Sequence, residues 1–129
     1  MYTMKAKTKV FNGLGKGEWI YDYSHDILTL KVKEQEYEKS IDVENYIFDF
    51  DPQGILRGIQ IFDASHVLGI ARGVLRQLSS FRFDCVMNGE RIFLKILLSA
   101  SYRNKKISHG QDIERILKQK QGKVICSTS

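Results

Sequence analysis

The residue types that could support metal or acid–base chemistry gather in two short stretches of this 129-residue sequence. These residues are Asp22, His25, Asp26, Asp63 and His66. Imidazole and carboxylate groups are the usual ligands of zinc and manganese, so the five could form a metal site. A structural role is the stronger interpretation, because carboxylates beside turns accept backbone N–H bonds and Asp63 has the position of a helix cap. We therefore expect no metal and no cofactor.

A thiol offers a second kind of chemistry. Cys85 with His25, His66 or His109 could form a nucleophile and base pair. However, Cys85 alternates along a predicted strand with Phe81, Phe83 and Met87 on the same face, which is typical of a buried, small apolar side chain. The glycine-rich segment 12–17 lacks the spacing of a phosphate-binding loop, which favours a linker. We predict no catalytic residue.

Nucleic-acid binding is suggested by charge. The formal net charge is +5, but residues 1–17 carry four lysines and no acid, residues 18–63 carry eleven acids against four bases, and residues 64–129 carry twelve bases against four acids. The bases most able to neutralise phosphates are Lys5, Lys7, Lys9, Arg72, Arg76, Arg103, Lys105 and Lys106. No zinc-finger, helix-turn-helix or ribonucleoprotein motif accompanies them, and scattered solvated side chains are the alternative.

Length and composition indicate one globular domain. The chain is 43% hydrophobic and 27% charged, with one proline. No apolar run reaches the roughly 20 residues that a membrane-spanning helix needs, and the start lacks the apolar stretch of a signal peptide. Two cysteines fit a reducing compartment. We expect a cytoplasmic protein with no membrane contact, made of a basic segment, 1–17, and a single domain, 18–129.

The first half of that domain has the alternation of β-strands. Residues 18–23 and 27–32 predict a hairpin, and further strands are expected at 39–43, 46–51 and 55–62. Asp51-Pro52-Gln53-Gly54 is a turn sequence, with proline at its second position and glycine at its fourth. These strands are expected to form an antiparallel meander.

One main helix is expected to cover that meander. It begins at Asp63-Ala64-Ser65, and apolar residues recur at helical spacing as far as Leu78. A hairpin follows, with strands at 81–87 and 91–100 around Asn88-Gly89. The second strand is apolar on both faces, which a central position or a dimer interface would explain.

A short peripheral helix is expected from Ser108, because Ser108 and Gln111 have capping-box spacing and Ile113, Ile116 and Leu117 form an apolar stripe. The predicted fold class is therefore α+β: an antiparallel sheet packed against one main helix, with a C-terminal hairpin and a short helix.

A family pattern begins at the first hairpin. It consists of Tyr21-Asp22-x-x-x-Asp26-x-Leu28-x-Leu30, then Asn45 through Phe48-Asp49, Gly54, and Gly58-Ile59-x-Ile61-x-Asp63-Ala64-Ser65. This pattern resembles the YuzE-like family, domain of unknown function number twenty-two eighty-three, over about residues 19–68. The chain departs from it at Gln60, where many members carry glutamate.

The resemblance implies a small α+β fold and no established activity. Some family members are regarded as partner halves of toxin–antitoxin-like pairs, which implies a protein-binding role. The motif residues that the resemblance marks are Tyr21, Asp22, Asp26, Asp49, Gly54, Gly58, Asp63 and Ser65.

Taken together, these observations predict a non-catalytic binding or regulatory protein that associates with itself or with another protein. Nucleic-acid binding through the basic flanks is the alternative. An enzyme of unknown chemistry is the third hypothesis, which loss of an activity on substitution of Asp22, Asp26 or His25 would support.

Overall fold

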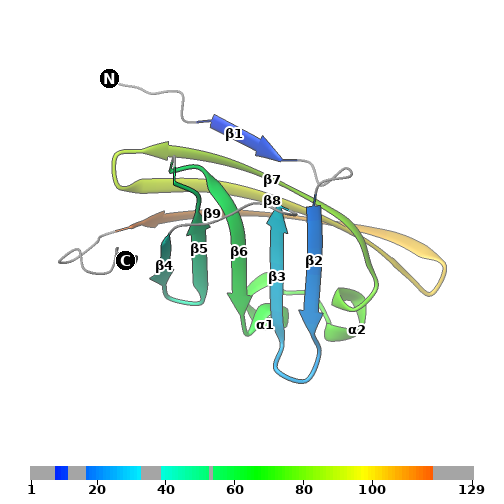
Figure 1. Ribbon diagram of the computed structural model, residues 1–129. Coiled ribbons are helices and arrows are strands. Elements are labelled where there is room, and N and C mark those ends of the chain that lie inside the picture. Colours follow the sequence, from blue (N-terminus) through cyan, green and yellow to red (C-terminus); the bar gives the residue numbers. More distant parts are fainter. Residues whose placement is uncertain (1–7, 12–16, 33–38, 53, 118–129) are drawn as a thin grey trace.

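Nine strands and two short helices make up the part of the chain that the computed structural model describes, residues 8–11, 17–32, 39–52 and 54–117 (Figure 1). Five of the strands form one antiparallel sheet in the order β2-β3-β6-β5-β4. Their bounds are β2 Gly17–Asp22, β3 Ile27–Val32, β4 Lys39–Val43, β5 Tyr46–Phe50 and β6 Leu56–Phe62. We call this the five-stranded sheet.

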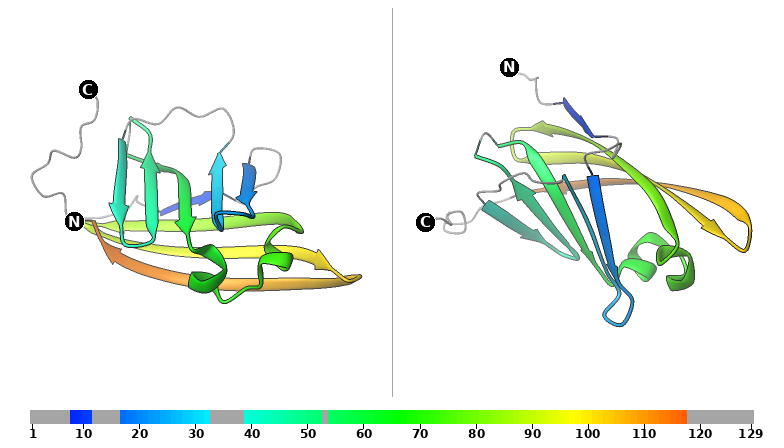
Figure 2. Two further views of the ribbon diagram at one scale, coloured as in Figure 1. Left: turned by 90° about the horizontal axis from the view of Figure 1, so that it is seen from below. Right: turned by 45° about the vertical axis from the view of Figure 1, so that its right-hand side comes forward.

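The other four strands form a second antiparallel sheet in the order β1-β7-β8-β9, the four-stranded sheet. They are β1 Thr8–Phe11, β7 Leu78–Asn88, β8 Arg91–Tyr102 and β9 Lys105–Ile116. Both views in Figure 2 show this sheet lying across the five-stranded sheet, with the two sets of strands running in crossing directions. The fold is therefore a two-layer β-sandwich.

Alternation of side chains makes each sheet apolar on one face, and the two apolar faces form a shared core. The largest fully buried side chains come from both layers: Leu28, Leu30, Phe48, Ile59 and Ile61 from one, and Phe83, Cys85, Ile92, Ile96 and Leu98 from the other. A sheet with one apolar face must bury that face against another element. Here each sheet supplies the cover for the other.

The predicted α+β class is wrong, because the four-stranded sheet, rather than one main helix, covers the five-stranded sheet. The expected long helix is two short ones, α1 (Ala64–Leu68) and α2 (Arg72–Leu75). Gly69 adopts the left-handed conformation (φ 70°) that ends helices, and Ala71 is extended. The apolar spacing was helical, but a glycine with positive φ divides the segment into two connectors between the sheets.

The expected peripheral helix is also wrong, since β9 occupies that segment. Arg103 and Asn104 both have positive φ, 54° and 64°, and form a tight turn that returns the chain alongside β8. β9 then pairs with β8 from Tyr102↔Lys105 to Arg91↔Ile116. The capping-box pattern was a local preference, and the hydrogen bonds available along the edge of β8 override it.

Strand order is the third difference from expectation. The five strands are antiparallel as predicted, but β3 pairs with β6, so β4 lies at the far edge beside β5 and the sheet is not a simple meander. The β2–β3 and β7–β8 hairpins are confirmed. The turn that ends at Gly54 is confirmed by the bond from its N–H to the Asp51 carbonyl, 2.9 Å, and by φ 81° at Gly54.

The helices of the described chain have five and four residues, which is too short for either to cross a membrane.

Candidate functional site

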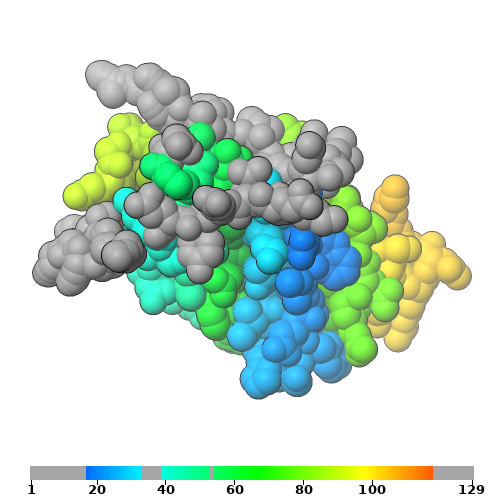
Figure 3. Space-filling model, viewed as in Figure 1, coloured from blue at the N-terminus to red at the C-terminus, as the bar shows by residue number. Residues whose placement is uncertain are grey.

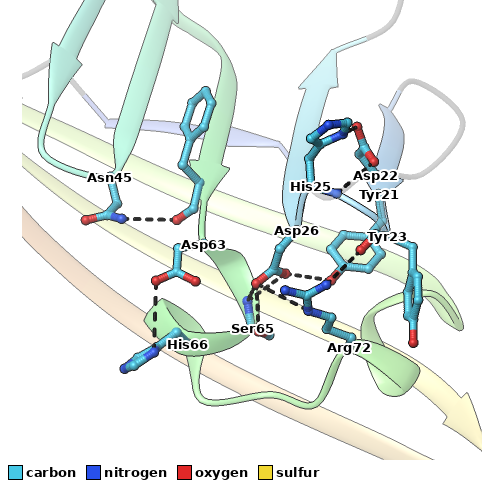
Figure 4. Close-up of polar contacts among 11 residues, drawn as sticks. Tyr21, Asp22, Tyr23, His25, Asp26, Asn45, Asp63, Ser65, His66 and Arg72 are labelled. Carbon is cyan, nitrogen blue, oxygen red and sulfur yellow. Dashed lines mark hydrogen bonds and ion pairs between the residues drawn. The ribbon is translucent and has the colours of Figure 1, made fainter.

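Three motif residues meet at the end of the β2–β3 hairpin, where it touches α1 (Figure 4). Asp26 is buried, and its Oδ1 accepts a hydrogen bond from the Tyr21 hydroxyl at 2.6 Å. The Ser65 N–H donates to the same oxygen at 3.0 Å, and the Ser65 hydroxyl donates to Oδ2 at 2.7 Å. Residues 39 positions apart in the sequence are thus joined by one carboxylate.

This carboxylate fixes the start of α1 from a distant turn. The Ala64 N–H donates to the Asp26 carbonyl at 2.9 Å, so both the backbone and the side chain of Asp26 receive the first N–H groups of the helix. Asp63, which the sequence marks as the cap, makes no side-chain cap bond and has a φ of 59°. The expected cap is therefore supplied by Asp26 instead of Asp63.

The surroundings keep the Asp26 carboxyl group ionised and the Tyr21 hydroxyl group neutral. Burial opposes ionisation of Asp26, but the hydrogen bonds from Tyr21 and Ser65, with the charge of Arg72, hold the pKa of its carboxyl below the usual value. Burial and the bond to Asp26 together raise the pKa of the Tyr21 hydroxyl above its usual value. Arg72 Nε lies 3.8 Å from Asp26 Oδ2. Because both Asp26 oxygens already accept bonds, the arrangement suits an anchor better than a general base.

The other residues considered for a metal site stay in separate pairs. His25 Nδ1 lies 2.9 Å from Asp22 Oδ2 at an exposed turn, and the bonds from His25 lower the pKa of the Asp22 carboxyl. His66 Nδ1 lies 3.9 Å from Asp63 Oδ2, also exposed. Within the described residues, no three His, Cys, Asp or Glu side chains come close enough to hold a metal ion.

Two further motif residues, Asp49 and Gly58, face each other across β5 and β6. The Ser40 hydroxyl donates to Asp49 Oδ1 at 2.6 Å, and a Cβ at position 58 would lie 3.1 Å from Asp49 Oδ2. Glycine at position 58 therefore makes room for the carboxyl group of Asp49.

The sequence patterns did not predict a partly buried ion pair at the β5–β6 turn. Asp51 is 5% exposed; its Oδ1 accepts the Ile55 N–H at 2.9 Å, and its Oδ2 lies 2.9 Å from Arg57 Nε. Asp at the first turn position was visible in the sequence, and such residues often bond the backbone a few residues later. The arginine six positions on was the signal that could have indicated a pair.

The thiol is part of the core. Cys85 is 1% exposed, and burial raises the pKa of its thiol to about 12. A thiol in this setting is a poor nucleophile.

The predicted basic residues divide between two places. Lys5 and Lys7 lie outside the described residues, and Lys9 is in β1, opposite Cys85 of β7. Arg72 and Arg76 belong to the α2 region, and Arg103, Lys105 and Lys106 lie at the β8–β9 turn. Tyr102 and Gly73 are close enough that a Cβ on Gly73 would lie 3.5 Å from the Tyr102 ring. The structure thus brings the helical and hairpin groups to one end of the molecule.

The side of the four-stranded sheet that faces away from the core is partly apolar. Val86, Phe93, Leu97 and Ile116 lie there and are 37–44% exposed. An open hollow of about 620 Å³ lies over this side, lined by Asp84, Val86, Phe93, Leu94, Lys95, Asp112, Ile113 and Glu114. β8 is central in its sheet and apolar on both faces, so the central position is confirmed and the interface stays a prediction.

Comparison with known protein families gives a match over the residues that form the motif cluster. A family described as a protein of unknown function, DUF2283, matches residues 19–65, which include the Tyr21, Asp26 and Ser65 cluster. The chain belongs to this family, and the predicted resemblance is confirmed.

Two curated relatives match more of the chain than the family model does. An uncharacterised protein of Methanocaldococcus jannaschii is 30% identical over 88 residues, 67% of this chain and 76% of the relative. A Methanosarcina mazei protein, named provisionally as a hypoxanthine phosphoribosyltransferase, is 29% identical over 92 residues, 71% of this chain and 75% of the relative. No solved structure matches the chain with a significant score.

Proposed function

We propose that this protein is a non-catalytic binding protein that pairs with a second copy of itself through the outer face of the four-stranded sheet. The outer face consists of Arg82, Asp84, Val86, Arg91, Phe93, Lys95, Leu97, Gly110, Asp112, Glu114 and Ile116. The observation that carries the proposal is a group of exposed apolar side chains on this face, Phe93 and Leu97 on β8, Val86 on β7 and Ile116 on β9, where an uncovered sheet face would ordinarily be polar.

Charge on the outer face favours a second copy as the occupant. The chain as a whole carries +5, so the net charges of two copies repel each other. The outer face carries three bases and three acids, and is therefore neutral. Arg91 and Glu114 already pair at 2.7 Å, whereas Lys95 and Asp112, opposite each other on β8 and β9, form no ion pair within the described chain.

In the proposed dimer, the two-fold axis runs parallel to the strands and lies above the outer face, midway between β8 and β9. This axis places Lys95 opposite Asp112 of the second copy, and Leu97 opposite Gly110 of the second copy, where no side chain is present. An isologous interface repeats each of these contacts twice. The contacts join opposite charges and place an exposed leucine where no side chain competes for the space.

The motif cluster supports binding over catalysis. Tyr21, Asp26 and Ser65 satisfy one another within the fold, and the Ser40 hydroxyl does the same for Asp49 between strands. We infer that the residues of the family pattern stabilise the five-stranded sheet and that the binding surface lies on the four-stranded sheet.

The test is a charge-swap series followed by sedimentation velocity. Lys95→Asp alone and Asp112→Lys alone each place like charges across the axis, so each variant is expected to be monomeric where the wild type is dimeric. An equal mixture of the two variants, and the double variant in one chain, restore opposite charges and are expected to dimerise. Lys31→Asp, on the exposed side of the five-stranded sheet, is the control and leaves the dimer intact.

Two results would overturn the proposal. One is a wild-type protein that stays monomeric at the highest concentration at which it is soluble. The other is loss of the dimer in the single variants without recovery in the mixture. Circular dichroism spectra of each variant show whether the fold is retained.

A further inference from the structure

A second surface lies where α2 and the β8–β9 turn lie together on one side of the molecule (Figures 1 and 3), next to the β2–β3 turn. Its members are cations and tyrosine rings: Tyr23, Arg72, Arg76, Tyr102, Arg103, Lys105 and Lys106. We call this surface the basic end. Only Lys106 shares a face with the proposed dimer: it pairs with Ser101, two residue pairs beyond Leu97↔Gly110, on the same side of the four-stranded sheet.

Contacts through α2 join the two halves of the basic end. The guanidinium carbon of Arg76 lies 4.2 Å from the centroid of the Tyr23 ring, and that of Arg103 lies 5.2 Å from the centroid of Tyr102. Gly73, three residues before Arg76, abuts Tyr102. Because residues three apart share a helix face, α2 connects the Tyr23 side to the Tyr102 side.

The cations of the basic end lie in two segments of the sequence that have no acidic residues. Residues 64–83 and 91–111 contain no Asp or Glu. Arg72 is partly engaged, since it donates to the Tyr23 carbonyl at 3.1 Å and lies near Asp26. Arg76, Arg103, Lys105 and Lys106 are exposed and, across the described ranges, take part in no ion pair. Their charge is therefore available to a ligand.

Aromatic rings beside these cations indicate what kind of anion fits. Tyr23 is 45% exposed, and its ring is stacked by a guanidinium group that is itself a flat platform. Nucleic-acid bases stack on tyrosine rings and on guanidinium planes, whereas lysine and arginine side chains neutralise phosphates. Alternating rings and cations suit a strand whose bases are unpaired.

We propose that the basic end binds single-stranded nucleic acid without sequence preference. Arg76, Arg103, Lys105 and Lys106 face the phosphates, and bases stack at Tyr23 and Tyr102. Duplexes hide the faces of their bases, so they can use only the phosphate contacts and bind more weakly. Because charge supplies much of the affinity, binding weakens as salt rises.

The experiment is fluorescence anisotropy of labelled mixed-sequence single-stranded RNA and a duplex of the same length, titrated with the full chain at low and near-physiological salt. Single strands are expected to bind more tightly than the duplex. Lys105→Ser with Lys106→Ser is expected to lower affinity about tenfold at low salt and to flatten the salt dependence. The matched control, Lys31→Ser with Lys39→Ser in the five-stranded sheet, removes the same charge away from both proposed surfaces and changes affinity less than about twofold.

A stacking variant separates ring contacts from charge. Tyr23→Leu removes a ring and no charge, so affinity is expected to fall at least about fivefold while the salt dependence keeps its slope. No binding at low salt, equal losses in the charge variant and its control, or tighter binding of the duplex would each overturn the proposal. Because the monomeric Lys95→Asp variant keeps the basic end, its binding shows whether the two surfaces are independent.

Discussion

The two layers of this sandwich are organised differently. The five-stranded sheet has short strands, of five to seven residues, and buried or partly buried carboxylates hold its turns at Asp26 and Asp51. In the four-stranded sheet, β7, β8 and β9 have 11 or 12 residues, and tight turns at Gly89 and at Arg103 and Asn104 connect them. Polar anchors therefore fix one layer, and strand pairing with apolar alternation builds the other.

The residues of the family pattern form only part of the hydrophobic core. The matched residues, 19–65, end as α1 begins, before any strand from β7 onward. Their apolar face is buried only because the four-stranded sheet lies on it. We expect the layers to fold as one unit despite their different construction.

The largest expected effect comes from the shared core. Phe48→Ala in one layer and Phe83→Ala in the other should each lower the free energy of unfolding by about 4 kcal/mol, because each leaves a cavity among fully buried side chains. Urea unfolding is followed by the fluorescence of Trp19, in β2, and by circular dichroism, which reports both layers. The two signals should move together.

Phe93→Ala is the matched control, because Phe93 is 37% exposed on the outer face. In dilute protein it should cost less than about 1 kcal/mol. If Phe83→Ala left the Trp19 transition unmoved, or if two transitions appeared, the layers would be independent.

The second largest effect on stability is expected from substitution of Asp26, the carboxylate that anchors the five-stranded sheet to α1. Asp26→Asn should lower the free energy of unfolding by about 3 kcal/mol, since the bonds to a buried charged acceptor from Tyr21 and Ser65 are weakened or lost. Asp22→Asn, at the exposed end of the same hairpin, should change stability little. Equal effects of the two substitutions in urea unfolding would argue against the anchor role.

A smaller difference in stability is expected between alanine substitutions of two strand glycines, Gly58 in the five-stranded sheet and Gly110 in the four-stranded sheet. Gly58→Ala should cost about 1 kcal/mol, because the new Cβ meets Asp49 Oδ2 at 3.1 Å. Gly110→Ala meets nothing closer than 4.0 Å and should be neutral or slightly stabilising in dilute protein. Thermal unfolding of the pair measures the difference, and the opposite order would refute this steric account of Gly58.

The smallest effect is pH dependence of the anchor. The folded pKa of Asp26 lies below its ordinary value of 3.8, so its stabilisation is complete above that value and is lost as the pH falls through the lowered pKa. The folded pKa of Tyr21 lies above its ordinary 10.0, so its contribution is lost as the pH rises beyond that value.

Stability measured against pH for Asp26→Asn and Tyr21→Phe checks both signs. The first variant should have a flatter acid limb than the wild type, and the second a flatter alkaline limb. A wild-type acid limb that Asp26→Asn leaves unchanged would assign the acid dependence to other carboxyl groups.

Sequence patterns predicted the local structure of the five-stranded sheet well. Alternation at 27–32, the turn residues at Asp51 and Gly54, and Asn88-Gly89 all act over a few neighbouring residues, so they could be recognised without the fold. The family pattern likewise depended only on order and spacing, and it was confirmed.

Tertiary structure decided what those patterns could not. Segments 64–78 and 108–117 had helical spacing or caps. A left-handed Gly69 nevertheless divides the first segment, and pairing with the edge of β8 makes the second a strand. Asp26 became the cap of α1, and α2 joined the Tyr23 side to the Tyr102 side, through contacts between residues far apart in sequence. Local preferences are small, and long-range hydrogen bonding and burial outweigh them.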